Sequence, residues 1–251
     1  DPELEGVQVL ALCPTRELAM QAAAEVEKFA RYKKGVKVAA VFGGASMEKQ
    51  IFQLRKGANF VIGTPGRVMD HLRRRTLRLG SLQMVILDEA DEMLNMGFRE
   101  DIETILAQAP VERQTVLFSA TMQENVKQLA FDYMHNPKEV SVSKDEVVLD
   151  LTKQYYISVG RRNKSWALCR ILDIDKPKAI IFCQTKKMVD VLEERLTSLH
   201  YKVEAIHGDM PQSKREKVMA DFKNDKTDIL IATDVAARGL DIDDITYVIN
   251  Y

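Results

Sequence analysis

Met84-Val85-Ile86-Leu87-Asp88-Glu89-Ala90-Asp91 is the stretch that decides the fold, because four apolar residues of strand length run directly into three carboxylates. Nucleotide-hydrolysing folds hold Mg²⁺ in this way at the carboxyl end of a buried strand. The metal needs oxygen ligands, and the attacking water needs a positioned carboxylate. The sequence has no glycine-rich G-x-x-x-x-G-K-[ST] loop to cradle the phosphates. The stretch therefore predicts half of an ATP site.

The composition excludes several classes of protein. With 251 residues, 46% of them hydrophobic and 29% charged, the chain can bury one large or two ordinary domain cores. No apolar run approaches the length that crosses a bilayer, and the acidic start at 1–5 resembles no secretory signal. We therefore expect a soluble, cytoplasmic protein with no membrane partner. The net charge of -1 means that any nucleic-acid contact must come from individually placed residues.

The three cysteines and the single tryptophan say less about function than the composition does. The three cysteines, Cys13, Cys169 and Cys183, are odd in number and form no C-x-x-C pair, which argues against a disulfide framework and a cysteine zinc site. We expect them to be buried, reduced thiols. We expect Trp166 to be a packing residue rather than a platform on which a base stacks.

Apolar runs of strand length alternate with helical patterns, which predicts βαβ units on a parallel sheet. A helix is expected at 17–29, where apolar residues recur at helical spacing. Helix starts are expected at Thr64-Pro65, with the hydroxyl as a cap, and at 209–212. In the first half we expect strands at 7–13, 36–42, 60–62, 84–87 and 115–118.

The two halves of the chain resemble each other at nearly constant sequence offsets. Any two α/β units alternate strands and turns in a similar way, so one matching pair of segments could arise without duplication. Three matching pairs in the same order favour duplication. We therefore infer a duplicated α/β module with a first domain at 1–143, a linker at 144–152 and a second domain at 153–251. The matches are 10–15 with 180–185, 37–44 with 202–208, and 61–64 with 230–233.

Ligand sites of a parallel sheet lie beyond the carboxyl ends of its strands. Here those ends carry hydroxyls, glycines, helix starts and single arginines, which suit a polyphosphate or a sugar-phosphate backbone. Each feature alone is more often only a cap or a turn. Together they favour binding sites at 14–17, 43–44, 64–67, 88–91, 119–121, 184–185, 207–209 and 233–234.

The family resemblance rests on ordered motifs that cover essentially the whole chain. They are Pro14–Ala19, Thr64–Arg67, Asp88–Asp91, Ser119–Thr121, Ile180–Thr185, His207–Asp209, Gln212–Arg215 and Thr233–Asp241. In these motifs the chain resembles the DEAD-box RNA helicases. The resemblance implies two tandem RecA-like parallel-sheet domains of α/β class. It also implies an RNA-dependent ATPase that separates strands locally by bending RNA as the two domains close.

The resemblance assigns catalytic roles to five residues. Asp88 would hold Mg²⁺ largely through water, and Glu89, beside the same ATP and metal, would orient or deprotonate the attacking water. Asp91 would contact Ser119 and Thr121 and so link the nucleotide state to domain closure.

The resemblance also assigns binding residues. Gly239 and Asp241 would meet the nucleotide, with Asp241 at the ribose. Contacts to the RNA sugar-phosphate backbone carry no base code, so binding would be independent of sequence. These contacts would come from Thr15, Arg16, Gly44, Thr64, Arg67 and Asp70 in the first domain and from Thr185, Gly208, Gln212, Arg215 and Thr233 in the second.

Two parts of the family pattern fall outside the sequence. The phosphate loop and the adenine-reading segment should precede 7–13, and a last motif with arginine fingers should follow Tyr251. We therefore expect the first domain to lack its P-loop strand and helix and the second to lack its C-terminal elements, as a result of truncation. Since an arginine finger alone is worth about 10³-fold or more in turnover, we expect these 251 residues by themselves to be inactive.

Two other functions fit parts of the sequence. A degenerate relative could clamp RNA or a protein without hydrolysis, but such a clamp has no need of both Asp88 and Glu89. A dinucleotide-binding oxidoreductase would need a G-x-G-x-x-G turn after a strand, which the sequence lacks. The leading hypothesis is therefore an ATP-dependent RNA helicase core with ATP and Mg²⁺ as cofactors.

Overall fold

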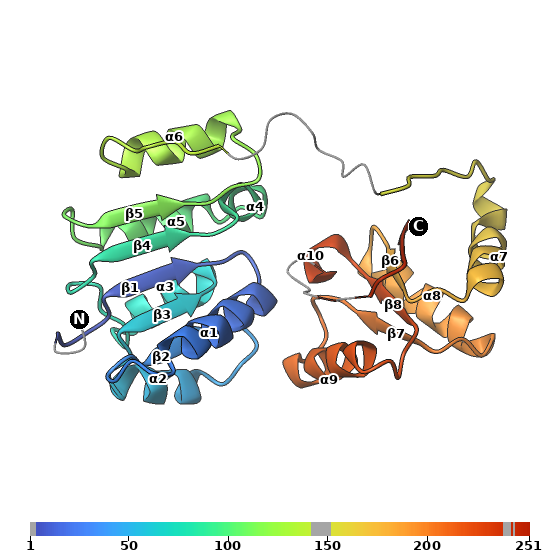
Figure 1. Ribbon diagram of the computed structural model, residues 1–251, viewed down its shortest axis with the longest axis horizontal. Helices are drawn as coiled ribbons and strands as arrows, with labels where there is room; N and C mark the ends of the chain where they lie inside the picture. The colour runs from blue at the N-terminus through green and yellow to red at the C-terminus, as the bar shows by residue number, and fades with distance from the viewer. Residues whose placement is uncertain (1–3, 142–151, 238–241, 243) are drawn as a thin grey trace. The chain divides into compact units, whose positions relative to one another are not determined.

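The computed structural model describes residues 4–141, 152–237, 242 and 244–251. The chain divides into two compact units between His135 and Asn136, each built on its own parallel sheet (Figure 1). The domain limits at 143 and 153 stay a prediction, because most of the predicted linker lies outside the described residues.

The first unit is a five-stranded parallel sheet with the strand order β2-β3-β1-β4-β5. Its strands are β1 (Val9–Leu12), β2 (Val38–Val41), β3 (Phe60–Gly63), β4 (Met84–Leu87) and β5 (Gln114–Leu117). The connecting helices are α1 (Arg16–Ala30), α2 (Met47–Arg55), α3 (Pro65–Arg73), α4 (Ala90–Asn95), α5 (Arg99–Ala107) and α6 (Glu124–Tyr133).

Helices cover both faces of this sheet, which is why its central strands are continuous apolar runs. Successive side chains of a strand point to opposite faces. Leu10 and Leu12 of β1 are fully buried in a cluster that includes α3 and α5, whereas Ala11 and Cys13 pack with α1 on the other face. The strand ends are thereby held rigidly, and the loops that follow them have a fixed base.

The second unit is a four-stranded parallel sheet with the order β7-β8-β6-β9. Its strands are β6 (Ala179–Phe182), β7 (Val203–Ile206), β8 (Ile229–Ala232) and β9 (Tyr247–Asn250). Its helices are the 3₁₀ turn η1 (Arg161–Asn163), α7 (Lys164–Asp175), α8 (Lys186–Ser198), α9 (Gln212–Lys223) and α10 (Asp234–Ala237).

The two sheets confirm the predicted duplication. The order β7-β8-β6-β9 repeats the order β2-β3-β1-β4, and all neighbouring strands are parallel in both. In each unit the first strand lies between the third and the fourth. The strand β9 therefore takes the place in its sheet that β4 takes in the first unit.

Local predictions were mostly confirmed, with shifts of one or two residues at the ends. The strand at 84–87 is β4, and the helix at 17–29 is α1. Two helix starts differ from prediction. Thr64 does precede α3, but its side chain accepts no capping hydrogen bond. The helix start expected at 209–212 is found at Gln212, but the N-cap residue is Pro211, and Asp209 pairs with Lys186.

Trp166 corrects a further prediction, since its side chain is 62% exposed rather than packed. Trp166 precedes the buried Leu168 of α7 by two positions, which places it about 200° round the helix, on the solvent side. The Arg170 guanidinium lies 5.7 Å from the centre of its ring. The cysteines follow the prediction more closely, since all three are free and Cys13 and Cys183 are buried, while Cys169 is half-buried.

Candidate nucleotide and nucleic-acid site

The end of β4 fixes the first two carboxylates of the acidic cluster. The backbone N–H of Asp88 donates to the carbonyl of Leu12 at 2.9 Å, so Asp88 is anchored where β4 leaves the sheet. Glu89 follows with φ 49° and ψ 54°. Non-glycine residues rarely adopt this left-handed conformation, and such strain concentrates at functional sites. Six other non-glycine residues of the described chain also have a positive φ, but Glu89 is the one that belongs to the acidic cluster.

Asp88 and Glu89 suit a magnesium ion. Burial raises the pKa of Asp88, against a smaller lowering by the backbone N–H of Glu89. A nearby cation would favour the charged carboxylate. Within the described ranges, no three His, Cys, Asp or Glu side chains gather as a metal cluster. Mg²⁺ keeps several waters and takes one or two carboxylates plus phosphate oxygens, and Asp88 and Glu89 could supply those carboxylates.

Asp91 joins the loop after β4 to the loop after β5. The carboxylate is buried, and its Oδ2 accepts hydrogen bonds from the backbone N–H of Thr121 at 3.0 Å and from the Thr121 hydroxyl at 2.7 Å. The Ser119 hydroxyl donates to the Thr121 carbonyl at 2.7 Å and shapes the same loop. Two segments 30 positions apart in sequence are thus held by one carboxylate.

The pKa of Asp91 reflects these bonds. Burial alone raises it, but hydrogen bonds from Thr121, Ser119 and the Glu92 N–H outweigh burial and hold it below the ordinary value of 3.8. A carboxylate with a lowered pKa adds stability above its unfolded pKa and loses it as the pH falls through the folded pKa. The ionised form of Asp91 therefore stabilises the fold at neutral pH.

We expect the Asp91→Asn variant to lose about 1–3 kcal/mol of unfolding free energy at pH 7, because an amide offers one acceptor fewer to this loop. The difference from the wild type should shrink as the pH falls below about 4. Urea unfolding at several pH values measures it. A difference that stays constant down to acid unfolding would contradict this role for the Asp91 charge.

Arg16, which follows β1, lies against the pair of glycines that follows β2, although β3 separates these two strands in the sheet. Thr15 caps α1, with its Oγ1 accepting from the Leu18 N–H at 3.3 Å, and so places Arg16 at the helix start. A Cβ added to Gly44 would come within 2.4 Å of Arg16 Nη1, and Gly44 has φ +83°. The backbone conformation thus favours glycine at this position, and any larger residue would also displace the Arg16 guanidinium.

The Gly44→Ala variant should therefore push the Arg16 guanidinium aside and strain the loop, at a cost of about 1–3 kcal/mol in stability. Gly80→Ala is a matched control, since nothing lies within 4 Å of a Cβ there. Thermal unfolding compares the two variants. Equal melting temperatures would show that the contact between Arg16 and Gly44 imposes no constraint.

Arg67 is held by a buried polar network. Its Nη1 donates to the Ala45 carbonyl at 3.1 Å and to Gln50 Oε1 at 3.0 Å. Gln50 Nε2 donates to the Phe42 carbonyl at 3.0 Å, and His71 Nε2 lies 3.0 Å from the same Oε1. Gln50 thus ties α3 to the loop that follows β2. We call the region beyond the carboxyl ends of β1, β2 and β3 the arginine edge; it carries Arg16 at the start of α1, Gly44 in the loop after β2, and Arg67 in the first turn of α3.

The partners of Gln50 determine the protonation of His71. The Phe42 carbonyl can only accept and Arg67 can only donate, so Gln50 Oε1 must face Arg67 and His71. His71 Nε2 then carries the proton, and Nδ1 accepts from the Thr76 hydroxyl at 2.8 Å. Burial first, and then the Arg67 charge, lower the pKa of His71, so the ring is neutral.

The remaining first-unit residues are placed as follows. Thr64 follows β3 and precedes Pro65, the first residue of α3. The Asp70 carboxylate lies 4.0 Å from Arg67 Nε and 3.9 Å from Arg73 Nη1. The structure therefore brings Arg67 and Asp70 together on α3.

The second unit carries the same kinds of residue at its strand ends. Thr185 caps α8, with its Oγ1 accepting from the Met188 N–H at 3.2 Å, as Thr15 does for α1. Gln212 and Arg215 are buried on α9, and Arg215 Nη1 donates to the His207 carbonyl at 3.4 Å. Gly208 lies in the turn after β7, and Thr233 follows β8. Gly239 and Asp241 lie outside the described residues.

Sequence reasoning missed Gln50 and His71 as site residues. Both are buried, with exposed fractions of 3% and 0%. The only available signal for a site role was that each is a polar residue on the buried side of its helix. Gln50 shares that side of α2 with Leu54, and His71 shares that side of α3 with Leu72. Such residues are often merely satisfied core groups, so spacing alone could not identify them.

Residues 1–129 match the family model described as DEAD/DEAH box helicase, and residues 163–251 match the helicase conserved C-terminal domain. The chain is 49% identical over 246 residues to the DEAD-box ATP-dependent RNA helicase CshA of Streptococcus pneumoniae. The aligned region covers 98% of this chain and 47% of CshA. The chain thus spans about half the length of the curated relatives that it matches.

Two solved structures are also similar. S. cerevisiae Dbp5 bound to RNA and ADP BeF3 matches with a TM-score of 0.89 and 32% identity, over 100% of this chain and 64% of that one. A DEAD box protein from the hyperthermophile Methanococcus jannaschii matches with a TM-score of 0.55 and 42% identity, over 100% of this chain and 67% of that one. With its motifs on two duplicated parallel sheets, the chain belongs to the DEAD/DEAH box helicase family.

Proposed function

We propose that the protein is an RNA-dependent ATPase that holds RNA by its sugar-phosphate backbone and couples ATP hydrolysis to local opening of duplexes. The observation that carries this proposal is the acidic cluster at the end of β4, whose third carboxylate, Asp91, is bonded to Thr121. The same sheet edge presents Arg16 and Arg67. Sites for a nucleotide and for a polyanion thus share one rigid base.

The two carboxylates after β4 have separate tasks in this proposal. Bound Mg²⁺ would neutralise charge on the phosphate oxygens of ATP, and Asp88 would hold the ion, largely through water. Glu89 orients the attacking water and accepts its proton. The left-handed backbone at Glu89 supports this division, because strained conformations of this kind concentrate at functional sites.

Asp91 links the nucleotide side to the loop at 119–121. It follows Asp88 by three positions, and its carboxylate accepts hydrogen bonds from Thr121 and Ser119 in the loop after β5. A shift of the loop after β4 on hydrolysis would therefore move Ser119 and Thr121. We propose that this movement couples the nucleotide state to domain closure, with Gly239 and Asp241 meeting the nucleotide from the second unit.

The RNA contacts are proposed for two sets of residues. In the first unit Arg16 and Arg67 supply charge to phosphates, while Thr15, Gly44, Thr64 and Asp70 contact sugar or phosphate. Thr185, Gly208, Gln212, Arg215 and Thr233 do so in the second unit. Gln50 and His71 act as positioning residues, because they hold Arg67 without lying at the surface. Such contacts are independent of base sequence.

The relatives support this proposal. CshA is named as an ATP-dependent RNA helicase, and Dbp5 was solved with RNA and ADP BeF3. We also propose a cytoplasmic location, since the free cysteines suit a reducing compartment. No helix of the described residues is both long and apolar enough to cross a membrane.

Fluorescence anisotropy with labelled single-stranded RNA tests the coupling in the whole protein. We expect RNA affinity to rise when a non-hydrolysable ATP analogue and Mg²⁺ are added, and to be similar for oligouridylate and for a mixed sequence. RNA affinity that does not respond to the nucleotide would refute the proposed link through Asp91. A strong preference for one sequence would refute recognition of the backbone alone.

A further inference from the structure

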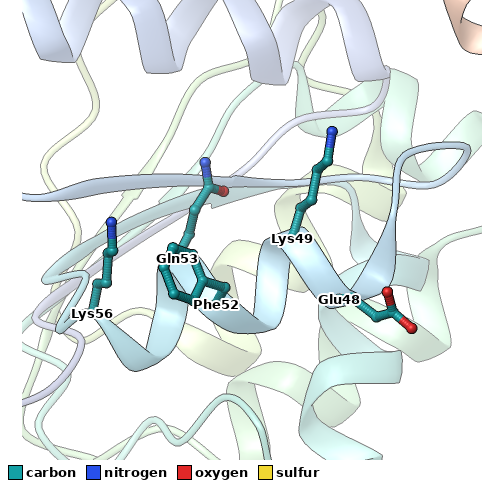
Figure 2. A pocket seen from close by; sticks show the side chains of 5 residues that line it. All are labelled: Glu48, Lys49, Phe52, Gln53 and Lys56. Carbon is teal, nitrogen blue, oxygen red and sulfur yellow. The ribbon is translucent and has the colours of Figure 1, made fainter.

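The outer face of α2 carries cations around an exposed aromatic ring. Lys49, Gln53 and Lys56 project from α2 in one direction, and Phe52 lies beside them (Figure 2). The Phe52 side chain is 59% exposed, and the Lys56 ammonium lies 4.4 Å from the centre of its ring. We call Lys49, Phe52, Gln53 and Lys56 the α2 surface.

The α2 surface continues into a second hollow. That hollow shares Gln53 and Lys56 with the first and adds Arg31, Lys33 and Lys37 from the segment between α1 and β2. Glu27 and Glu48 are the acidic residues that line the two hollows among the described residues. Five cations against two carboxylates make this region basic within a chain whose net charge is -1.

The α2 surface also begins next to the arginine edge. The hydroxyl of Ser46, two residues after Gly44, accepts from the backbone N–H of Lys49 at 3.3 Å and starts the helix. From Lys49 to Lys56 the helix rises about 10 Å. A strand bound by Arg16 and Arg67 could therefore continue along α2, whose N-cap lies two residues after Gly44 in the chain.

We propose that the α2 surface binds the single-stranded RNA that extends beyond the arginine edge, and this inference rests on the proposed function. Exposed aromatic rings between cations are the usual means of holding single strands, because each nucleotide offers a base to stack and a phosphate to pair. Lys56 moves from the Phe52 ring to a phosphate as a base stacks on that ring. An acidic peptide would use the cations but has no need of the ring.

Binding of two oligouridylates to the whole protein tests this inference. One is short enough to occupy only the core RNA path, and the other is the same strand extended at its 3′ or its 5′ end. We expect extension at one end to tighten binding. In the Phe52→Ala and Lys56→Gln variants that gain should fall by about 5-fold or more, while the short strand binds as in the wild type.

The matched control is Phe131→Ala, which removes a more exposed ring, 81% against 59%, from α6 at the other edge of the sheet. Phe131→Ala should leave the gain from extension unchanged. Extension that adds no affinity in the wild type overturns the inference, even if the short strand binds well. Failure of the short strand itself overturns the proposed function instead. Polyglutamate that binds the wild type and Phe52→Ala equally well, but binds Lys56→Gln more weakly, would assign the surface to an acidic protein segment and would also overturn the inference.

Discussion

The Glu89→Gln variant of the whole protein should hydrolyse ATP about 10²- to 10⁴-fold more slowly than the wild type, the usual contribution of a general base. The amide keeps the size of the side chain and the left-handed backbone at this position, but it cannot accept the proton of the attacking water. RNA binding in the presence of ATP should remain, because the arginine edge is untouched. Phosphate release and RNA anisotropy, measured on the same preparation, separate the two effects.

Glu100→Gln is the control for Glu89→Gln. Glu100 is an exposed acidic residue in the first turn of the neighbouring α5, so its substitution changes charge near the sheet without touching the site. Its turnover should stay within about 2-fold of the wild type, the range of ordinary surface substitutions. If Glu89→Gln hydrolysed ATP as fast as Glu100→Gln, another group would have to activate the water.

The Gln50→Leu variant should lose about 2 kcal/mol or more of unfolding free energy and should bind RNA more weakly. Leucine fills the space, but it leaves the Phe42 carbonyl, an Arg67 N–H and the His71 Nε2–H without their buried partner. Arg67 then loses its fixed position. We expect the KM for RNA to rise about 10-fold while kcat at saturating RNA changes little, which corresponds to about 1.4 kcal/mol of binding energy.

Two further variants distinguish positioning from general destabilisation. Gln128→Leu removes an exposed amide from α6 and should change neither stability nor the KM for RNA. Gln50→Glu keeps acceptors for Arg67 and His71 and adds a negative charge, which should raise the pKa of His71 and shift the pH profile of RNA binding. A Gln50→Glu profile identical to that of the wild type would mean that His71 is not coupled to the RNA contacts.

The sequence was sufficient to predict features that repeat or that follow from apolar periodicity. The four apolar residues before Asp88 became β4 with unchanged bounds, because a strand covered on both faces reads as an uninterrupted apolar run. The duplication was visible in three ordered matches, and the equal strand order of the two sheets confirms it.

Other features depend on contacts that sequence does not encode locally. Gln50 and His71 lie 21 positions apart in the chain, and they meet only because the fold brings α2 and α3 together. Trp166 is exposed because α7 turns the side with Leu168 and Leu172 toward the core. The sequence of α7 is only weakly amphipathic, so it did not indicate which side would be buried. The left-handed conformation of Glu89 likewise arises where β4 must turn sharply into α4.

Phosphate release from Mg²⁺-ATP by the whole protein, with and without single-stranded RNA, decides whether it is an RNA-dependent ATPase. We expect slow hydrolysis without RNA, a marked rise when RNA is added, and loss of that rise in Glu89→Gln. Binding of RNA and ATP with no hydrolysis under any condition would contradict this expectation and would identify a clamp that does not turn over.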